Sequence, residues 1–143
     1  MSKTVADAMT PDPQAVQPWT AVRFAAQVME REDVGSLPVV HENGTLAGIV
    51  TDRDIVLRLV ASGKDIDQAQ VGEVLSEDPV MISPDESLDT ALELMAKHQI
   101  RRLPVVMDTQ LVGMLSQADV AQQSKPKQAG QLLESISADA ELD

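Results

Sequence analysis

Residues 46–54 read LAGIVTDRD, and a related segment, LVGMLSQAD, follows at residues 111–119. In both segments an apolar run with a central glycine leads to a hydroxyl residue, and an aspartate follows three positions later. These positions are occupied by Gly48, Thr51 and Asp54 in the first segment, and by Gly113, Ser116 and Asp119 in the second. An apolar run that ends at a hydroxyl residue is typical of a strand leading into a helix. We therefore predict the same strand-to-helix unit twice.

The similarity extends over most of the chain, as expected when a whole supersecondary unit has been duplicated. Pro18 recurs as Pro84, and the run LPVV at residues 37–40 recurs at residues 103–106. One offset relates these pairs, and it shortens by one residue because the turn HENGT at 41–45 is replaced by MDTQ at 107–110. Loops tolerate such length changes. The chain is therefore a tandem repeat.

Each repeat is predicted to contain a short helix, a short strand, a longer helix, a two-stranded hairpin and a closing helix. In the first repeat we expect Thr20 to cap the longer helix, which ends near Asp33. The closing helix is predicted over residues 52–61, with buried side chains at Ile55, Val56, Leu59 and Val60. The fold class is α/β (α+β). We assign repeat 1 to residues 1–62, a linker to 63–70, repeat 2 to 71–123 and an acidic, partly helical tail to 124–143.

Composition limits the classes of function. A chain of 143 residues is long enough for one compact domain or for two half-size units that share a core, and we expect the halves to pack face to face. The formal net charge of -12 argues against nucleic acid as a partner, because phosphate binding depends on Lys and Arg. There is no cysteine, and no apolar run is long enough to span a bilayer. We expect a cytoplasmic protein with no membrane association.

Catalysis and metal binding find no support in the sequence. We recognise no nucleophile with a base and an orienting group, and no phosphate-binding P-loop, so we expect no enzyme activity. His41 and His98 stand alone, without the ligand spacing of a metal site. The Thr51-x-x-Asp54 and Ser116-x-x-Asp119 motifs have two compatible interpretations. They can cap helices, or the aspartate can accept hydrogen bonds from the vicinal hydroxyls of a ribose.

The duplication, the LPVV strand and the Gly-x-x-Thr/Ser-x-x-Asp ending together resemble a pair of CBS (cystathionine β-synthase) domains, often called a Bateman module. The resemblance covers about residues 5–122 and implies two repeats packed with pseudo-twofold symmetry. It implies a regulatory module that senses AMP, ADP or ATP, with S-adenosylmethionine as a further candidate and no covalent cofactor. It also implies a homodimer that acts on an effector protein. The alternatives are a ligand-free scaffold for protein interaction and an enzyme acting on nucleotides.

The resemblance further implies that each ligand lies in a cleft between the repeats and takes residues from both. Site one would combine Thr51, Arg53 and Asp54 with Val80, Ile100, Arg101 and Arg102. Site two would combine Ser116 and Asp119 with Gln14, Val16, Val34, Gly35 and Ser36. The planar guanidinium of arginine suits phosphate, although two solvated charges are the alternative interpretation of the arginine pair. Because site two lacks basic residues at Gly35 and Ser36, we expect site one to bind phosphate more strongly.

Overall fold

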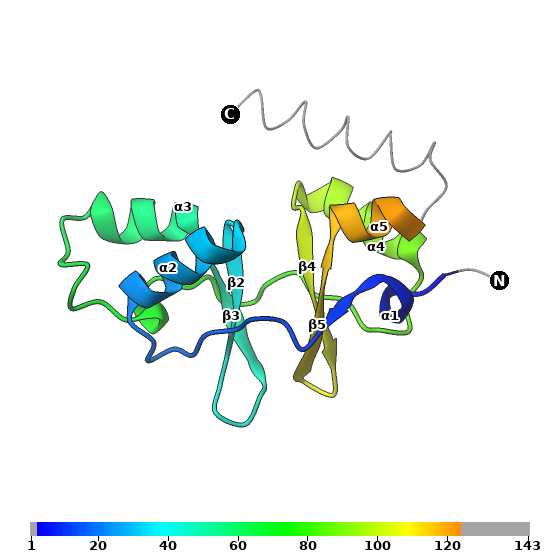
Figure 1. Ribbon diagram of the computed structural model, residues 1–143, viewed down its shortest axis with the longest axis horizontal. Coiled ribbons are helices and arrows are strands. Elements are labelled where there is room, and N and C mark those ends of the chain that lie inside the picture. Colours follow the sequence, from blue (N-terminus) through cyan, green and yellow to red (C-terminus); the bar gives the residue numbers. More distant parts are fainter. Residues whose placement is uncertain (1–2, 124–143) are drawn as a thin grey trace. The chain divides into compact units, whose positions relative to one another are not determined.

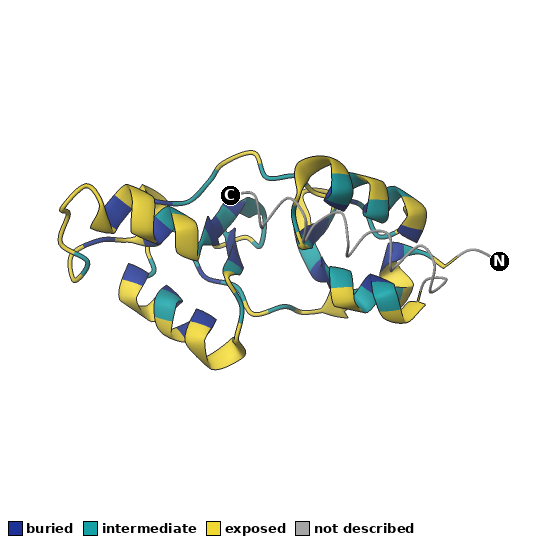
Figure 2. Cartoon of the chain, turned by 90° about the horizontal axis from the view of Figure 1, so that it is seen from above, coloured by how far each residue is buried: buried dark blue, intermediate teal, exposed yellow. Residues whose placement is uncertain are grey.

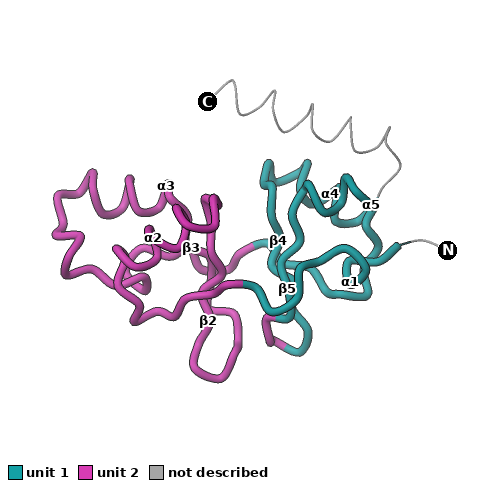
Figure 3. The backbone as a smooth tube through the Cα atoms, viewed as in Figure 1, with its two compact units in different colours: residues 1–13, 80–108, 112–143 teal, residues 14–79, 109–111 magenta. Residues whose placement is uncertain are grey.

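The computed structural model describes residues 3–123, which form two compact units of helices and short strands (Figures 1 and 3). Within the described residues, unit 1 comprises residues 3–13, 80–108 and 112–123, and unit 2 comprises Gln14–Pro79 and Thr109–Leu111. The predicted α/β class is confirmed. The predicted tail at residues 124–143 lies outside the described residues. The units do not coincide with the sequence repeats, because the start of each repeat packs with the rest of the other repeat.

Unit 2 is built on an antiparallel hairpin of β2 (Ser36–Val40) and β3 (Leu46–Thr51). Its helical elements are α2 (Val22–Glu32), α3 (Asp52–Ile55), the π-helical turn η1 (Val56–Val60) that continues α3, and the 3-10 turn η2 (Val71–Glu73). Two isolated bridges extend the hairpin. Val16 pairs in parallel with Val39, and Ser76 pairs antiparallel with Ile49. The hairpin is therefore flanked by a short extended segment on each side.

Unit 1 repeats this arrangement with β4 (Arg102–Met107) and β5 (Gln110–Ser116). Its other elements are α1 (Val5–Ala8), β1 (Thr10–Pro11), α4 (Leu88–His98) and α5 (Gln117–Gln123). The strand order is β1-β5-β4, and Ile82 pairs in parallel with Val105 on the outer side of β4. Strand β1 therefore has the place in unit 1 that the segment at Ser76 has in unit 2.

Each unit has its own cluster of buried apolar side chains. Figure 2 colours the buried residues of the helices and strands dark blue. The largest fully buried members of the cluster in unit 2 are Leu59, Val16, Val22, Val28, Val39, Val50, Val71 and Val74. Those of the cluster in unit 1 are Met95, Leu103, Leu115 and Val5. Each unit thus has a buried cluster of its own among residues 3–123, and face-to-face packing of the halves stays a prediction. Each hairpin is covered by helices of its own unit, and their apolar faces fill the space above it.

Two details of the first repeat differ from the prediction. Val56 and Val60 were predicted to be buried, yet their side chains are 53% and 59% exposed. The α-helical pattern changes after Ile55 to a π-helical turn, and only Ile55 and Leu59 on this helix reach the core.

The predicted cap at Thr20 is also wrong. Helix α2 begins one residue later, with Ala21 as its N-cap. The hydroxyl of Thr20 instead accepts a hydrogen bond from the Gln17 N–H at 2.9 Å. The end of the helix is as predicted, because Asp33 has a left-handed conformation with a φ of 55° and terminates it.

The central glycine of each motif lies where another segment approaches its strand closely. Ile49 and Ser76 exchange two backbone hydrogen bonds of 3.1 and 2.8 Å, which brings the Ser76 carbonyl against Gly48. A Cβ atom added at Gly48 would overlap that carbonyl oxygen. At Gly113 an added Cβ would lie 3.0 Å from the carbonyl oxygen of Thr10 in β1. The packing of the fold therefore requires both glycines, and they do not by themselves indicate a ligand.

We expect Gly48→Ala to destabilise the protein by about 1–3 kcal/mol, the usual cost of overpacking. The added methyl group meets a hydrogen-bonded backbone carbonyl that cannot move without loss of the pairing at Ser76. The matched control is Gly35→Ala, whose Cβ would lie 3.1 Å from a side-chain oxygen of Asp52, which can rotate away. Urea denaturation of both variants measures the difference, and equal stability of the two would contradict the close approach.

Candidate functional site

Both hydroxyl–aspartate motifs form a reciprocal cap at the start of a helix. In unit 2 the Thr51 hydroxyl accepts from the Asp54 N–H at 3.0 Å, and the Asp54 carboxylate accepts from the Thr51 N–H at 3.1 Å. In unit 1 the Ser116 hydroxyl accepts from the Asp119 N–H at 3.1 Å, and the Asp119 carboxylate accepts from the Ser116 N–H at 3.1 Å. The capping interpretation of both motifs is confirmed. Each carboxylate uses one oxygen, Oδ2, for the cap.

The same kind of cap occurs elsewhere in residues 3–123, away from these motifs. The Thr4 N–H donates to the Asp7 carboxylate at 2.9 Å, and this backbone hydrogen bond lowers the pKa of Asp7 below its usual value. The Gln70 N–H donates to the Glu73 carboxylate at 2.6 Å. Caps of this kind are therefore not confined to the two hydroxyl–aspartate motifs. A ligand site must be argued from what else surrounds each motif.

In unit 2 the start of β2 lies beside the motif. Ser36 pairs with Thr51 across the hairpin, and the Asp52 N–H donates to the Gly35 carbonyl at 3.0 Å. Arg53 is exposed on the first turn of α3. Unit 2 contains the following predicted site residues: Gln14, Val16, Val34, Gly35, Ser36, Thr51, Arg53 and Asp54.

In unit 1 the start of β4 lies beside the second motif. The Gln117 N–H donates to the Arg101 carbonyl at 2.8 Å, which fixes the backbone of Arg101 against the residue after Ser116. Among residues 3–123, neither the Arg101 nor the Arg102 guanidinium has an ion pair or hydrogen bond. Arg101 is exposed and Arg102 is half-buried. Unit 1 contains the following predicted site residues: Val80, Ile100, Arg101, Arg102, Ser116 and Asp119.

The structure thus groups the predicted site residues differently from the sequence analysis. The arginine pair lies in the same unit as Ser116 and Asp119, whereas the sequence assigned it to the site of Thr51 and Asp54. The combination of residues from both units stays a prediction. Of the two described units, only unit 1 contains both a motif and the pair Arg101 and Arg102.

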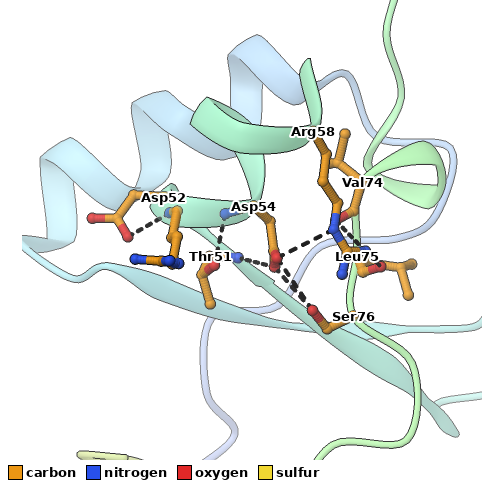
Figure 4. Close-up of polar contacts among 8 residues, drawn as sticks. Thr51, Asp52, Asp54, Arg58, Val74, Leu75 and Ser76 are labelled. Carbon is orange, nitrogen blue, oxygen red and sulfur yellow. Dashed lines mark hydrogen bonds and ion pairs between the residues drawn. The ribbon is translucent and has the colours of Figure 1, made fainter. Parts of the chain in front are cut away.

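The carboxylate of Asp54 lies at the centre of a polar network that the sequence analysis missed (Figure 4). The Ser76 hydroxyl lies 3.2 and 3.3 Å from its two oxygens, and the Arg58 Nε lies 3.7 Å from Oδ1. Arg58 also donates through Nη1 to the Leu75 carbonyl at 2.9 Å. The side chain of Asp54 is only 12% exposed. These contacts connect Leu75 and Ser76 to the helix formed by α3 and η1.

The surroundings of Asp119 are simpler. Among residues 3–123, its carboxylate accepts only the capping hydrogen bond from Ser116. The neighbouring Gln117 has a buried side-chain oxygen, Oε1, that has no hydrogen-bond partner within the described part of the chain. Its counterpart in the first repeat, Asp52, uses its Oδ1 to accept from the Arg53 N–H at 2.8 Å. The polar groups at the unit 1 motif are therefore less fully satisfied than those of unit 2.

A sequence signal existed for only one of the missed residues. Arg58 follows Asp54 by four positions, the spacing of an acid–base pair on a helix. Ser76 is 22 positions from Asp54 and meets it only because the start of the second repeat packs into unit 2. The unpaired oxygen of Gln117 is a property of packing and leaves no trace in the sequence pattern.

In the described part of the chain, no three side chains of the His, Cys, Asp or Glu type are placed to hold a metal ion. None of the helices between residues 3 and 123 has the length and apolar character needed to cross a membrane.

Comparison with known proteins assigns the class. The profile of the CBS domain family matches residues 5–61 and again residues 71–125. The CBS domain-containing protein YhcV of Bacillus subtilis is 44% identical over 135 residues, which is 94% of this chain and 95% of YhcV. This chain belongs to the CBS domain family, as the resemblance of its motifs implied.

Two solved structures are similar over most of the chain. The first is CBSX2 of Arabidopsis thaliana in complex with AMP, with 29% identity and a TM-score of 0.74 over 83% of this chain and 94% of that chain. The second is the CBS domain pair of MJ0100 in complex with 5′-methylthioadenosine and S-adenosyl-L-methionine. It has 26% identity and a TM-score of 0.74, and the match covers 85% of this chain and 95% of that chain. The predicted tandem CBS fold is therefore confirmed.

Proposed function

We propose that this chain is a regulatory module that binds an adenosine-containing ligand of the AMP, ADP or ATP type, with S-adenosylmethionine as the related alternative. The observation that carries the proposal comes from unit 1. Among residues 3–123, Asp119 accepts only its capping hydrogen bond there, and the backbone carbonyl of Arg101 accepts a hydrogen bond from the residue after Ser116. Two similar CBS pairs are described in complex with adenosine compounds. Both facts support a ligand with a ribose, and the arginines support one that also has a phosphate.

The chemistry of these groups matches the parts of a nucleotide. A carboxylate accepts hydrogen bonds from vicinal ribose hydroxyls, and hydrogen bonds to a charged acceptor are stronger than those between neutral groups. The arginine fork suits the oxygens of phosphate. Val80 and Ile100 are partly buried aliphatic residues of unit 1, which suits an adenine held by apolar contacts. The chain has one Trp, one Phe and no Tyr, so aromatic stacking has little part in binding.

The proposed ligand-contacting residues are those predicted from the sequence. They are Gln14, Val16, Val34, Gly35, Ser36, Thr51, Arg53, Asp54, Val80, Ile100, Arg101, Arg102, Ser116 and Asp119. The proposed role is regulatory because a ligand that binds one arrangement of the chain more tightly than another shifts the population toward it. The signal would then pass to an effector protein.

Calorimetric titration of the protein with AMP, ADP, ATP and S-adenosylmethionine tests the proposal. We expect at least one of these compounds to bind. A ligand at 100 times its dissociation constant stabilises the folded state by about 2.7 kcal/mol, so thermal denaturation should report the same ligand.

The control for this experiment is a comparison of aspartate variants. The double variant Asp54→Asn/Asp119→Asn should lose binding, because both proposed ribose acceptors lose their charge. Asp7→Asn alters a cap of the same kind outside the motifs and should bind like the wild type. Absence of binding for all four compounds would reject the proposed function, and a ligand-free scaffold would then be the better account.

A homodimer is the proposed assembly, and the apolar surface of unit 2 supports it. Phe24 on α2 and Val56, Leu57 and Val60 on the α3–η1 helix are 49%, 53%, 52% and 59% exposed. The two helices pack against each other. The corresponding positions in the second repeat that the structure describes are Thr90, Ala121 and Gln122, which are more polar. Exposed apolar groups of this kind are typical of an interaction surface.

We expect Leu57→Glu to raise the dimer dissociation constant at least about tenfold, because an unpaired charge would be buried in the interface. Gln122→Glu places the same charge at the corresponding position of unit 1 and should leave the assembly unchanged. Light scattering over a range of protein concentrations measures both. A wild-type protein that is monomeric at all concentrations would contradict the proposed dimer.

A further inference from the structure

The chain passes from one unit to the other at two equivalent places, after Pro13 and after Pro79 (Figure 3). The other changes of unit enclose only Thr109–Leu111 at the tip of a hairpin. Each of the two prolines follows an aspartate, and the offset between Asp12-Pro13 and Asp78-Pro79 is the one that relates Pro18 to Pro84. The two crossings are therefore built from the same dipeptide at corresponding positions of the repeats.

Each crossing connects a strand pairing in one unit to a strand pairing in the other. At the first crossing the chain leaves β1 of unit 1 and joins the sheet of unit 2 at Val16. At the second it leaves unit 2 after Ser76 and joins unit 1 at Ile82. Among residues 3–123, the segments 12–15 and 77–81 take part in no hydrogen bond or ion pair. Segments without such contacts open most easily in a folded protein.

The aspartates at the crossings have a backbone conformation that is uncommon before proline. The φ angle is 47° for Asp12 and 53° for Asp78. Positive φ is uncommon for any residue other than glycine, and the residue before a proline is normally extended with a negative φ. Both side chains are exposed. Neither carboxylate has a hydrogen bond within residues 3–123 that would impose this conformation.

The other non-glycine residues with a positive φ in residues 3–123 have local explanations. Asp33 and Gln99 are the C-caps of α2 and α4, where left-handed residues are common. Asp108 and Thr109 form the turn between β4 and β5, and tight hairpin turns need positive φ at both central residues. Asp12 and Asp78 belong to no helix end and no hairpin turn.

The conformation of these two aspartates therefore depends on the strand pairings that flank each crossing, which lie in different units. Proline has a fixed φ, so a change of direction at the crossing falls mainly on the residue before it. A change of φ at the aspartate redirects the chain that leads to the other unit. Because both crossings join the same two units, a change at one requires a change at the other.

We infer that Asp12-Pro13 and Asp78-Pro79 form a paired hinge, and that the left-handed conformation of both aspartates selects one arrangement of the two units. Hinges are commonly a few loop residues that absorb a large change in φ and ψ. The inference goes beyond the proposed function because it does not depend on a ligand. A hinge of this kind gives the chain two arrangements between which any binding event could shift the population.

The distance between one label in each unit tests the hinge. The chain has no cysteine, so Lys64→Cys in unit 2 and Lys97→Cys in unit 1 create two specific attachment points for spin labels at exposed positions. Pulsed electron paramagnetic resonance then gives the distribution of distances between the labels. An excess of unlabelled protein removes the distances between different copies of the chain.

The informative variant is Asp12→Ala/Asp78→Ala, which disfavours positive φ at both hinges. We expect a second distance to appear, or to grow by roughly fivefold or more relative to the main distance, because a left-handed conformation is costly for a residue with a Cβ atom. Asp12→Gly/Asp78→Gly lacks the carboxylates as well but accepts positive φ freely, so it should retain the distances of the wild type. The difference between the two variants therefore isolates the backbone conformation.

The matched control is Asp33→Ala, which replaces an aspartate with a φ of 55° that lies within unit 2 and at no crossing. It should lower the melting temperature and leave the distances unchanged. Three results would overturn the hinge: unchanged distances in the alanine double variant, equal changes in the alanine and glycine double variants, or the same change in Asp33→Ala. Should the alanine double variant fail to fold, Asp12→Ala and Asp78→Ala are measured singly, and unchanged distances in both would overturn the hinge as well.

Discussion

The contact on which the fold depends is the backbone pairing between the start of one repeat and the last strand of the other. In unit 2 this pairing joins Ser76 to Ile49, and in unit 1 it joins Thr10 to Met114. It requires a residue without a side chain at Gly48 and at Gly113. It also explains why the compact units exchange their first segments relative to the sequence repeats. A single constraint, the close approach of two backbones, thus accounts for both the domain organisation and the most conspicuous part of the motif.

The same pairing determines what surrounds the motif aspartate. A strand that passes over the glycine places its next side chains near the start of the following helix, where the aspartate lies. In unit 2 the serine that arrives there donates to Asp54, and an arginine one turn along the helix completes the network. In unit 1 the pairing is the same, but the residue on the helix is a glutamine, and among residues 3–123 Asp119 accepts only its capping hydrogen bond. Duplication has preserved the backbone arrangement, and a few side chains have changed the chemistry at one copy.

Features that depend on residues close together in the sequence could be predicted, and features that depend on residues far apart in the sequence could not. The repeat, the element types and the caps at Thr51 and Ser116 follow local patterns, and the structure confirms them. The exposure of Val56 and Val60 was mispredicted, because apolar periodicity assumes a regular α-helix and the chain forms a π-helical turn there. The network at Asp54 could not be predicted, since Ser76 reaches it through a pairing between segments that are distant in the sequence. The placement of the arginine pair beside Ser116 likewise follows from the backbone contact between Gln117 and Arg101.

The local charges near the two motifs differ, and this difference affects how well each motif could bind an anionic ligand. A chain with 23 acidic and 11 basic residues repels anions over most of its surface, so affinity for a phosphate must come from local cations. At Asp54 one of the two nearby arginines is already used, because Arg58 faces the carboxylate and a backbone carbonyl, whereas Arg53 is exposed on the first turn of α3. In unit 1 the arginines at the start of β4 have no ion partner among residues 3–123. A cation committed to an internal carboxylate stabilises the fold and adds little to ligand binding, whereas an unpaired cation can neutralise a ligand. The arrangement of the arginines, more than that of the aspartates, therefore distinguishes the two copies of the motif.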